Sequence, residues 1–141
     1  MIIKIAQADQ ERKDAFQTRH TVFIQEQKVP PDEEMDHFDD NAIHFIGYED
    51  GQSIAASRLR FIDHCGKLER ICVLPPYRGK SYGRQLIEAM EKEILIHGFV
   101  KAKLNSQSHA TEFYEKLGYK IISEEFMDAG IPHVTMTKNL S

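Results

Sequence analysis

The stretch VLPPYRGKSYGRQLIEAM, from Val73 to Met90, contains Gly79-Lys80-Ser81, which matches the end of a nucleotide-binding P-loop. A P-loop needs a glycine five positions before Gly79, but Leu74 stands there and two prolines follow it. Prolines have no N–H group to offer a phosphate oxygen. The dinucleotide pattern G-x-G-x-x-G is also absent. The segment is therefore a basic turn of another type, between a hydrophobic strand and a helix.

The composition of this turn favours an anion site. Gly79 and Gly83 permit a tight turn and a close approach of a ligand to the backbone. The N-terminus of the following helix offers unpaired N–H groups and a partial positive charge, and Arg78, Lys80 and Arg84 add full charges. A pyrophosphate would fit such a site. The alternative is a solvated basic helix start, and the turn alone does not separate the two interpretations.

The bulk properties limit the function classes. A chain of 141 residues predicts one domain, residues 1–141. The net charge of −4 argues against binding to nucleic acid, and no apolar run is long enough for a membrane span. The start of the chain is too short and too polar for a signal peptide. Two cysteines, Cys65 and Cys72, form no C-x-x-C pair, which predicts a cytoplasmic protein without a structural metal site.

Hydrophobic periodicity and turn residues predict an α+β domain with a largely antiparallel sheet. A hairpin at Asp50-Gly51 joins two of the expected strands, and Leu68, Arg70 and Cys72 of the third strand should face one side, with Glu69, Ile71 and Val73 on the other. The expected strands are 2–6, 42–49, 53–62, 67–74, 100–105, 119–126 and 133–138, and the expected helices are 10–27, 82–97 and 108–118.

The segment ERICVLPPYRG and the run Arg78-Gly79-Lys80-Ser81-Tyr82-Gly83 resemble the acyl-CoA signature [QR]-x-x-G-x-[GA] of the GNAT superfamily of N-acetyltransferases. The later FYEKLGY (Phe113–Tyr119) resembles a second element of that superfamily. The opening RHTVFIQEQKVP and the closing DAGIPHVTM look like those of a subgroup of small, uncharacterised bacterial members. One departure is Ser81, which stands where the first signature glycine is usual.

The resemblance implies a three-layer α/β/α fold of α+β class. Its mixed, largely antiparallel sheet would be splayed at two parallel strands and flanked by about four helices. It also implies acetyl-CoA as cosubstrate and no metal. The residues that would bind the cofactor are the strand backbone at Ile71, Cys72 and Val73, the turn Arg78, Gly79, Lys80, Ser81, Tyr82, Gly83 and Arg84, and Asn105 across the split.

Direct transfer to an amine needs a base, an oxyanion donor and an acid. By resemblance Glu69 is the expected base, the backbone N–H of Val73 the oxyanion donor and Tyr114 the acid. The alternative for Glu69 is an ion pair with Arg58 or Arg60. The alternative for Tyr114 is a place in the core. A covalent acyl-cysteine route through Cys72 is disfavoured, because members of the superfamily transfer directly.

Glu26, Gln27 and His133 are the expected substrate-binding residues, and His133 is a second candidate base. The acidic run between Asp32 and Asp40 is either a solvated loop or an attractant for a cationic amine. The predicted function is acetylation of the primary amine of a small polar acceptor such as an amino acid. The alternatives are a protein or peptide N-acetyltransferase and a CoA-binding regulatory module without turnover. The resemblance also allows a homodimer.

Overall fold

The computed structural model describes all 141 residues and is built on one eight-stranded sheet. The strand order is β1-β2-β3-β4-β5-β8-β6, and β7 pairs with β8 outside this path. All neighbouring strands run antiparallel except β4 and β5, which run parallel. The strands are β1 (Ile2–Ile5), β2 (Ile43–Glu49), β3 (Gln52–Ile62), β4 (Cys65–Val73), β5 (Lys101–Gln107), β6 (Lys120–Ile121), β7 (Phe126–Asp128) and β8 (Ile131–Asn139).

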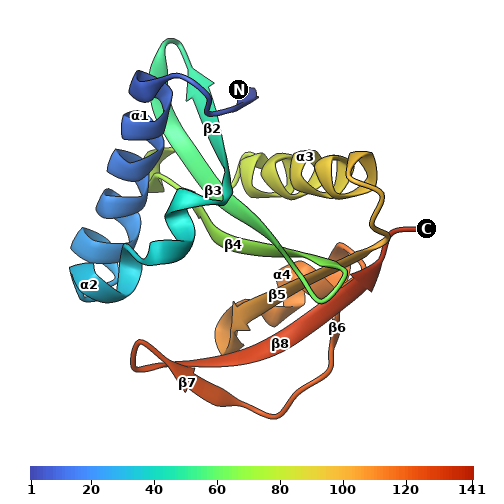
Figure 1. Cartoon of the computed structure of the whole chain (residues 1–141). Coiled ribbons are helices and arrows are strands. Elements are labelled where there is room, and N and C mark those ends of the chain that lie inside the picture. Colours follow the sequence, from blue (N-terminus) through green and yellow to red (C-terminus); the bar gives the residue numbers. More distant parts are fainter.

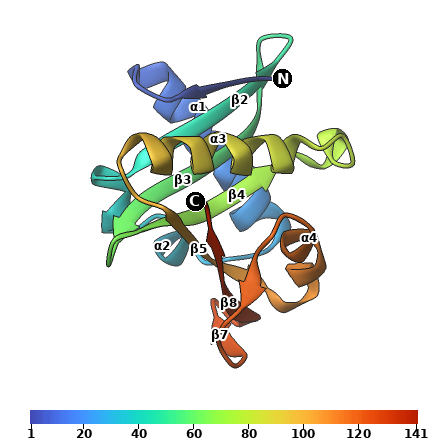
Figure 2. The same cartoon turned by 90° about the vertical axis from the view of Figure 1, so that its right-hand side faces the viewer.

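Helices cover both faces of this sheet, as Figures 1 and 2 show. The four α-helices are α1 (Asp9–Arg19), α2 (Pro31–Glu34), α3 (Tyr82–Ile96) and α4 (Thr111–Lys116). The predicted apolar stripe of α3 is buried and forms the larger core with β3, β4 and β5, while α1 packs over a smaller cluster on the opposite face. The predicted three-layer α+β fold is thereby confirmed. No helix combines the length and the apolar character that a bilayer span requires.

The hairpin predicted at Asp50-Gly51 joins β2 to β3. Asp50 has φ 51° and Gly51 has φ 78°. Two successive residues with positive φ give a turn whose twist matches that of the flanking strands. The hairpin therefore holds β3, which carries Arg58 and Arg60, in register beside β2.

The sheet opens between β4 and β5, as the resemblance implied. The two strands pair only where Gly66–Leu68 faces Ala102–Leu104. Beyond these residues the edge of β4 has no strand neighbour on the β5 side, and in Figure 1 the two halves of the sheet diverge there. The unpaired edge exposes backbone donors and acceptors, so a ligand can pair with it as a strand would.

The expected alternation of β4 is wrong beyond Glu69. Arg70 has φ 54°, and the β3–β4 register shifts between Ala56 and Arg58, which marks a bulge. Glu69 faces Arg58, and Cys72 faces Ala56, so Glu69 and Cys72 lie on the α1 side of the sheet. Ile71 and Val73 pack with the larger core on the α3 side. One inserted residue thus moves Glu69 away from the face of Ile71.

Two further segments differ from the expected elements. The helix predicted at 10–27 is α-helical only to Arg19 and continues as a π-helix over His20–Glu26. The strand predicted at 119–126 is reduced to β6 and β7. Thr135 on β8 donates its backbone N–H to the hydroxyl of Ser123 at 2.8 Å. This serine replaces the next ladder partner, so β6 ends.

Candidate active site

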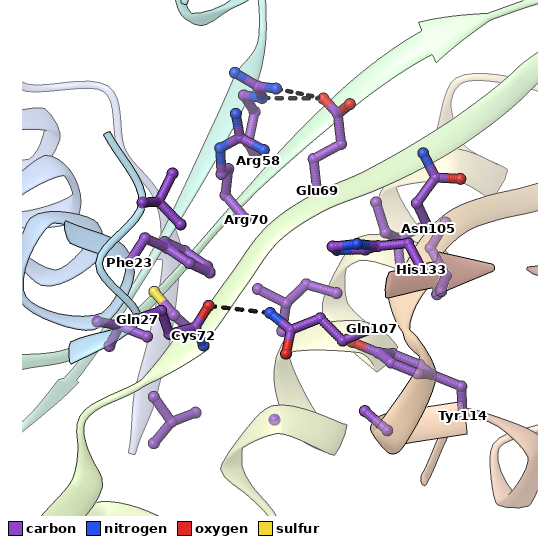
Figure 3. A pocket seen from close by; sticks show the side chains of 18 of the residues that line it. Phe23, Gln27, Arg58, Glu69, Arg70, Cys72, Asn105, Gln107, Tyr114 and His133 are labelled. Atoms are coloured by element: carbon purple, nitrogen blue, oxygen red, sulfur yellow. Dashed lines mark hydrogen bonds and ion pairs between the residues drawn. The ribbon is translucent and has the colours of Figure 1, made fainter. Parts of the chain in front are cut away.

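A cleft of about 1000 Å³ occupies the split between β4 and β5. Its walls come from the end of the π-helix, from β3 and β4, from the turn before α3, and from β5, α4 and β8. Figure 3 shows side chains from these elements facing one another across the opening. Most of the predicted site residues line it. Glu26 and Lys80 do not.

The turn before α3 presents free backbone donors at one end of the cleft. Gly79 has φ 80°, and Ser81, the residue before the first helical turn, has φ 66°. The Ser81 side chain makes no capping hydrogen bond, and its carbonyl accepts the N–H of Gln85 at 3.1 Å. The N–H groups of residues 82–84 therefore have no helical partner. Together with the helix dipole they form a site for an anion.

The backbone conformation at Ser81 accounts for the glycine that the signature usually has at this position. A residue at φ 66° is left-handed, and glycine adopts this conformation without steric cost. Serine adopts it here as well, at a cost of about 1–2 kcal/mol. The turn has the shape for which the signature selects glycine.

Arg78 is held by protein groups. Its guanidinium forms two hydrogen bonds of 2.7 Å with the carboxylate of Glu26, and its Nε donates to the carbonyl of Val73 at 2.9 Å. The hydrogen bond from Arg78 lowers the pKa of Glu26. This pair ties the end of the π-helix to the turn before α3. It brings together one residue expected at the cofactor and one expected at the acceptor.

The other cations and the tyrosine of the turn differ in their partners. Lys80 lies with its Nζ 5.7 Å from the centroid of the Tyr77 ring. Arg84 donates from Nε to Glu88 at 2.9 Å and lines the cleft. The hydroxyl of Tyr82 donates to the carboxylate of Glu49 on β2, and this hydrogen bond raises the pKa of the phenol.

The edge of β4 presents one free donor next to the turn. Leu74 donates its N–H to the carbonyl of Ile54 on β3 at 2.8 Å. Successive peptide groups of a strand point to opposite sides, so the N–H of Val73 points away from β3 and toward the split. The Cys72 side chain points into the smaller core, where it is 4% exposed, and burial raises the pKa of its thiol to about 12.

Tyr114 reaches the cleft from α4. Its ring packs edge-on against Phe113 and Tyr119, with centroid distances of 5.0 and 6.2 Å. The structure gives its hydroxyl no hydrogen-bond partner from the protein, and the residue lines the cleft (Figure 3). Burial raises the pKa of Tyr114 to about 12, so the phenol keeps its proton at neutral pH. The residue thus both packs against the core and faces the cleft.

Glu69 lies in the ion pairs that were considered as its alternative role. Its carboxylate accepts hydrogen bonds from Arg60 at 2.6 and 3.0 Å and from Arg58 at 3.0 Å, and Lys67 lies at 3.3 Å. Burial would raise the pKa of Glu69. The hydrogen bond from Arg60 and the charges of Arg58 and Lys67 outweigh burial and lower it to about 2.

His133 lies across the cleft from β4, at the start of β8 (Figure 3). Its Nδ1–H donates to the carbonyl of Ile131 at 2.7 Å, and its ring stacks on Phe126 at 6.1 Å between centroids. The Ile131 carbonyl can only accept, so in the neutral ring the proton is on Nδ1 and the lone pair is on Nε2. On the neighbouring strand Asn105 accepts the hydroxyl proton of Thr135 through Oδ1 at 2.9 Å, and its amide nitrogen makes no hydrogen bond to the protein.

A pair of glutamines crosses the cleft. Gln107, at the end of β5, donates from its amide nitrogen to Gln27 Oε1 at 3.0 Å, and Figure 3 shows this bond between the two walls. His109 donates in turn to Gln107 Oε1 at 2.6 Å. Sequence reasoning missed Gln107. A signal was present, because Gln107 is two residues beyond Asn105 and so lies on the same face of the strand.

The acidic run is solvated only in part, since Asp32, Glu33 and Asp40 are exposed and its other acidic residues are not. It forms α2 and a 3₁₀ helix over His37–Asp40, and three of its carboxylates pair with buried arginines. Arg19 bonds to Glu34 at 2.7 Å and to Asp39 at 2.8 Å, and Arg58 bonds to Asp36 at 2.7 Å and to Asp39 at 3.1 Å. Arg19 and Arg58 are 0% and 1% exposed. Three of the six acidic side chains of the run are therefore neutralised by arginines, and sequence reasoning missed these partners.

Comparisons with known proteins agree with this geometry. The profile of the acetyltransferase (GNAT) domain family matches residues 7–140. The uncharacterized N-acetyltransferase YjcF of Bacillus subtilis is 43% identical over 136 residues, which are 96% of this chain and 97% of YjcF. A protein of Lactobacillus plantarum, provisionally assigned as an N-acetyltransferase, has a crystal structure with a TM-score of 0.93 and 30% identity, covering 99% of this chain and 98% of that one.

A more distant likeness concerns the fold alone. An aminoglycoside 6′-N-acetyltransferase complexed with coenzyme A superposes with a TM-score of 0.79 at 17% identity, over 100% of this chain and 98% of that chain. The family match, the relatives and the split sheet with its free helix N-terminus lead to one conclusion. The chain belongs to the GNAT acetyltransferase family and is an acyltransferase of that family.

Proposed function

We propose that this enzyme transfers the acetyl group of acetyl-CoA directly to the primary amine of a small polar acceptor such as an amino acid. One observation carries the proposal. The free N–H groups at the start of α3, the free edge of β4 and the unbonded hydroxyl of Tyr114 all border the same cleft. The complex of the aminoglycoside 6′-N-acetyltransferase with coenzyme A supports the same use of the fold.

In this proposal the pyrophosphate of CoA binds at the turn before α3. The backbone N–H groups between Gly79 and Arg84 donate to it, and Lys80 and Arg84 add positive charge. The pantetheine arm pairs with the backbone of β4 at Ile71–Val73, and Asn105 offers its free amide nitrogen from β5. Arg78 contributes mainly by holding the turn through Glu26.

The chemistry removes two protons from the ammonium nitrogen and delivers one to the departing sulfur. The attacking nitrogen forms a bond to the thioester carbon, and the N–H of Val73 stabilises the oxyanion that develops. As the C–S bond breaks, the thiolate takes the proton of Tyr114. The nitrogen lost its first proton to the base before the attack, and it gives up a second as the amide forms, which restores the Tyr114 phenol. A phenol whose pKa is raised to about 12 still carries the proton that this step requires at neutral pH.

Two residues compete for the role of base. His133 lines the cleft, and its neutral ring has the lone pair on Nε2, because Nδ1–H donates to Ile131. Glu69 is a weak base, since its pKa is lowered to about 2 and three cations surround it. We therefore propose that His133 takes the ammonium proton and that Glu69 positions the arginines. Glu69 acting through an ordered water is the alternative.

The acceptor is proposed to be small because the cleft is crossed by the Gln27–Gln107 hydrogen bond. An extended peptide would have to break this bridge to pass between the walls, whereas a small amine fits beside it. The protein or peptide acetyltransferase remains the competing function on this point.

A screen of amines, amino acids and peptides with acetyl-CoA, followed by release of the CoA thiol, tests the proposal. We expect turnover of free small amines. Turnover of peptide or protein amines only would overturn the small-molecule acceptor. Binding of CoA by a folded protein without thiol release from any acceptor would contradict acetyl transfer itself.

A further inference from the structure

Nine charged side chains form one network beside the acceptor end of the cleft. Its arginines differ in how many of their N–H groups donate to protein partners. Ion pairs join the cations Arg19, Arg58, Arg60, Lys67 and Arg70 to the carboxylates Glu34, Asp36, Asp39 and Glu69. Five cations against four carboxylates leave one positive charge. Glu33 and Asp128 also border the cleft, but both are exposed and solvent screens them.

Two of the arginines have a protein partner on each of their three guanidinium nitrogens. Arg19 donates from Nε, Nη1 and Nη2 to Glu34 and Asp39. Arg58 donates to Asp36, Asp39 and Glu69, and its Nη2 lies 2.9 Å from Glu69. Both side chains are almost completely buried. They pair with the carboxylates around them through every guanidinium nitrogen, and their burial keeps them from a ligand.

The other two arginines keep free donors at the cleft. Arg70 uses Nε and Nη2 on the carbonyls of Glu33 and Glu34 and on Asp36, and its Nη1 has no partner from the protein. Arg60 uses Nε and Nη2 on Glu69, and its Nη1 is likewise free. Both line the cleft, and their side chains are 23% and 15% exposed.

The bulge in β4 sets the direction of the Arg70 side chain. Arg70 is the residue at φ 54° in the bulge of β4, directly before Ile71, where an arginine is strained and a glycine would not be. Bulges next to active sites re-aim side chains. In Figure 3 Arg70 lies beside Arg58, on the wall that faces His133 and Asn105. Burial, together with the charges of Arg58 and Arg19, lowers the pKa of Arg70.

We propose that the acceptor amine carries a carboxylate, and that the free Nη1 groups of Arg70 and Arg60 bind it. The inference rests on the proposed acetyl transfer and specifies its substrate class as amino acids in the broad sense. A single carboxylate balances the one unpaired positive charge of the network. A guanidinium with two free N–H groups on one nitrogen suits a carboxylate oxygen.

The test compares each amino acid with its amide and with its decarboxylated amine. Binding to the CoA-loaded protein is measured by calorimetry, and turnover by thiol release. We expect carboxylate-bearing amines to bind at least about 10-fold more tightly than the matched amides. Equal binding of acid and amide, or no carboxylate-dependent binding by any amine in the panel, would overturn the inference. Neither result depends on whether thiol is released, so failure of acetyl transfer is recognised separately.

Variants at position 70 link the preference to one residue. Arg70→Asn and Arg70→Gly both suit a left-handed backbone, so the bulge is kept while the guanidinium is removed. We expect the acid-over-amide preference to fall by roughly 10-fold in both, with CoA affinity unchanged. A purely structural role of Arg70 would weaken acids and amides alike, and that result would contradict the proposal. Arg60→Gln provides a second, independent removal of a free donor.

Discussion

The two ends of the cleft are built in different ways. The cofactor end is formed by one continuous piece of chain, from Ile71 through the turn to Arg84, and uses mainly backbone groups. The acceptor end is assembled from distant segments that contribute Arg19, Asp36, Arg58 and Glu69, and uses mainly charged side chains. The first can be recognised in a short stretch of sequence, whereas the second exists only after the sheet and α1 have packed together.

This difference has a consequence for substitutions. At the cofactor end, added bulk or charge acts on the ligand. At the acceptor end, removal of one charge unbalances a buried network and acts on the whole fold. Substitutions at the two ends should therefore be distinguished by whether ligand binding or stability changes.

The largest effect is expected from removing the hydroxyl of Tyr114, the proposed acid, which lies between the two ends of the cleft. Tyr114→Phe keeps the ring and removes the hydroxyl, so kcat should fall by about 10²–10⁴-fold while the affinity for CoA stays the same. Tyr119→Phe is the matched control, because that hydroxyl donates to Glu91 at 2.8 Å and lies outside the cleft lining. Turnover of Tyr114→Phe within a few-fold of the native enzyme would return Tyr114 to a packing role.

At the cofactor end, Gly83→Asp should weaken CoA binding by at least about 100-fold, equivalent to about 2.7 kcal/mol, because it places a carboxylate at the pyrophosphate. Gly83→Ala is the control. A methyl group there would meet only Phe113 Cζ at 3.5 Å, an ordinary contact, so the fold tolerates it. Calorimetry measures both variants. Unchanged CoA binding by a folded Gly83→Asp protein would remove the phosphate site from this turn.

At the acceptor end, Glu69→Gln should destabilise the fold. A pKa lowered from 4.5 to about 2 corresponds to about 3 kcal/mol of stability at neutral pH. The folded pKa is below the unfolded one, so this contribution is complete above about pH 4.5 and is lost as the pH falls toward 2. Urea unfolding should therefore separate the native and Glu69→Gln proteins at pH 7 and bring them together near pH 2. Equal stability of the two proteins at pH 7 would contradict the network.

The smallest expected effect is a gain. Ser81→Gly removes the strain of a left-handed serine and adds the chain entropy of a glycine in the unfolded state. The net change should be a stabilisation of roughly 0.5–1 kcal/mol. Thermal unfolding measures it, and CoA affinity should stay within a few-fold. A loss of stability would show that the serine side chain has a role that its missing capping bond does not indicate.

Features formed by residues that are close in sequence are predicted, and features assembled from distant segments are not. The core stripe of α3, the β2–β3 hairpin and the basic turn depend on neighbours in the chain, so their periodicity and glycines predict them. The bulge at Arg70 was not predicted, because an inserted residue leaves no mark in an alternating pattern. The bridge from Gln27 to Gln107 and the ion pairs of Arg19 join residues far apart in sequence, and only the packed sheet brings them together.

The sequence likewise leaves open the roles of some site residues. From the sequence, Glu69 could be either a catalytic base or the ion-pair partner of Arg58 or Arg60. In the structure its carboxylate pairs with both arginines.

The two candidate bases, His133 and Glu69, can be separated by their variants. If His133 is the base, His133→Asn removes the acidic limb of the pH–rate profile, while Glu69→Gln keeps its shape and lowers stability.

The central claim is that one cleft holds acetyl-CoA and the amine together and that the acetyl group passes directly between them. Initial rates measured while both substrates are varied test this most directly. The account predicts intersecting double-reciprocal lines, and no acetylated protein when acetyl-CoA is added without acceptor, because the Cys72 thiol is buried and its pKa is raised to about 12. Parallel lines, together with an acetyl group on Cys72 or another side chain, would contradict it.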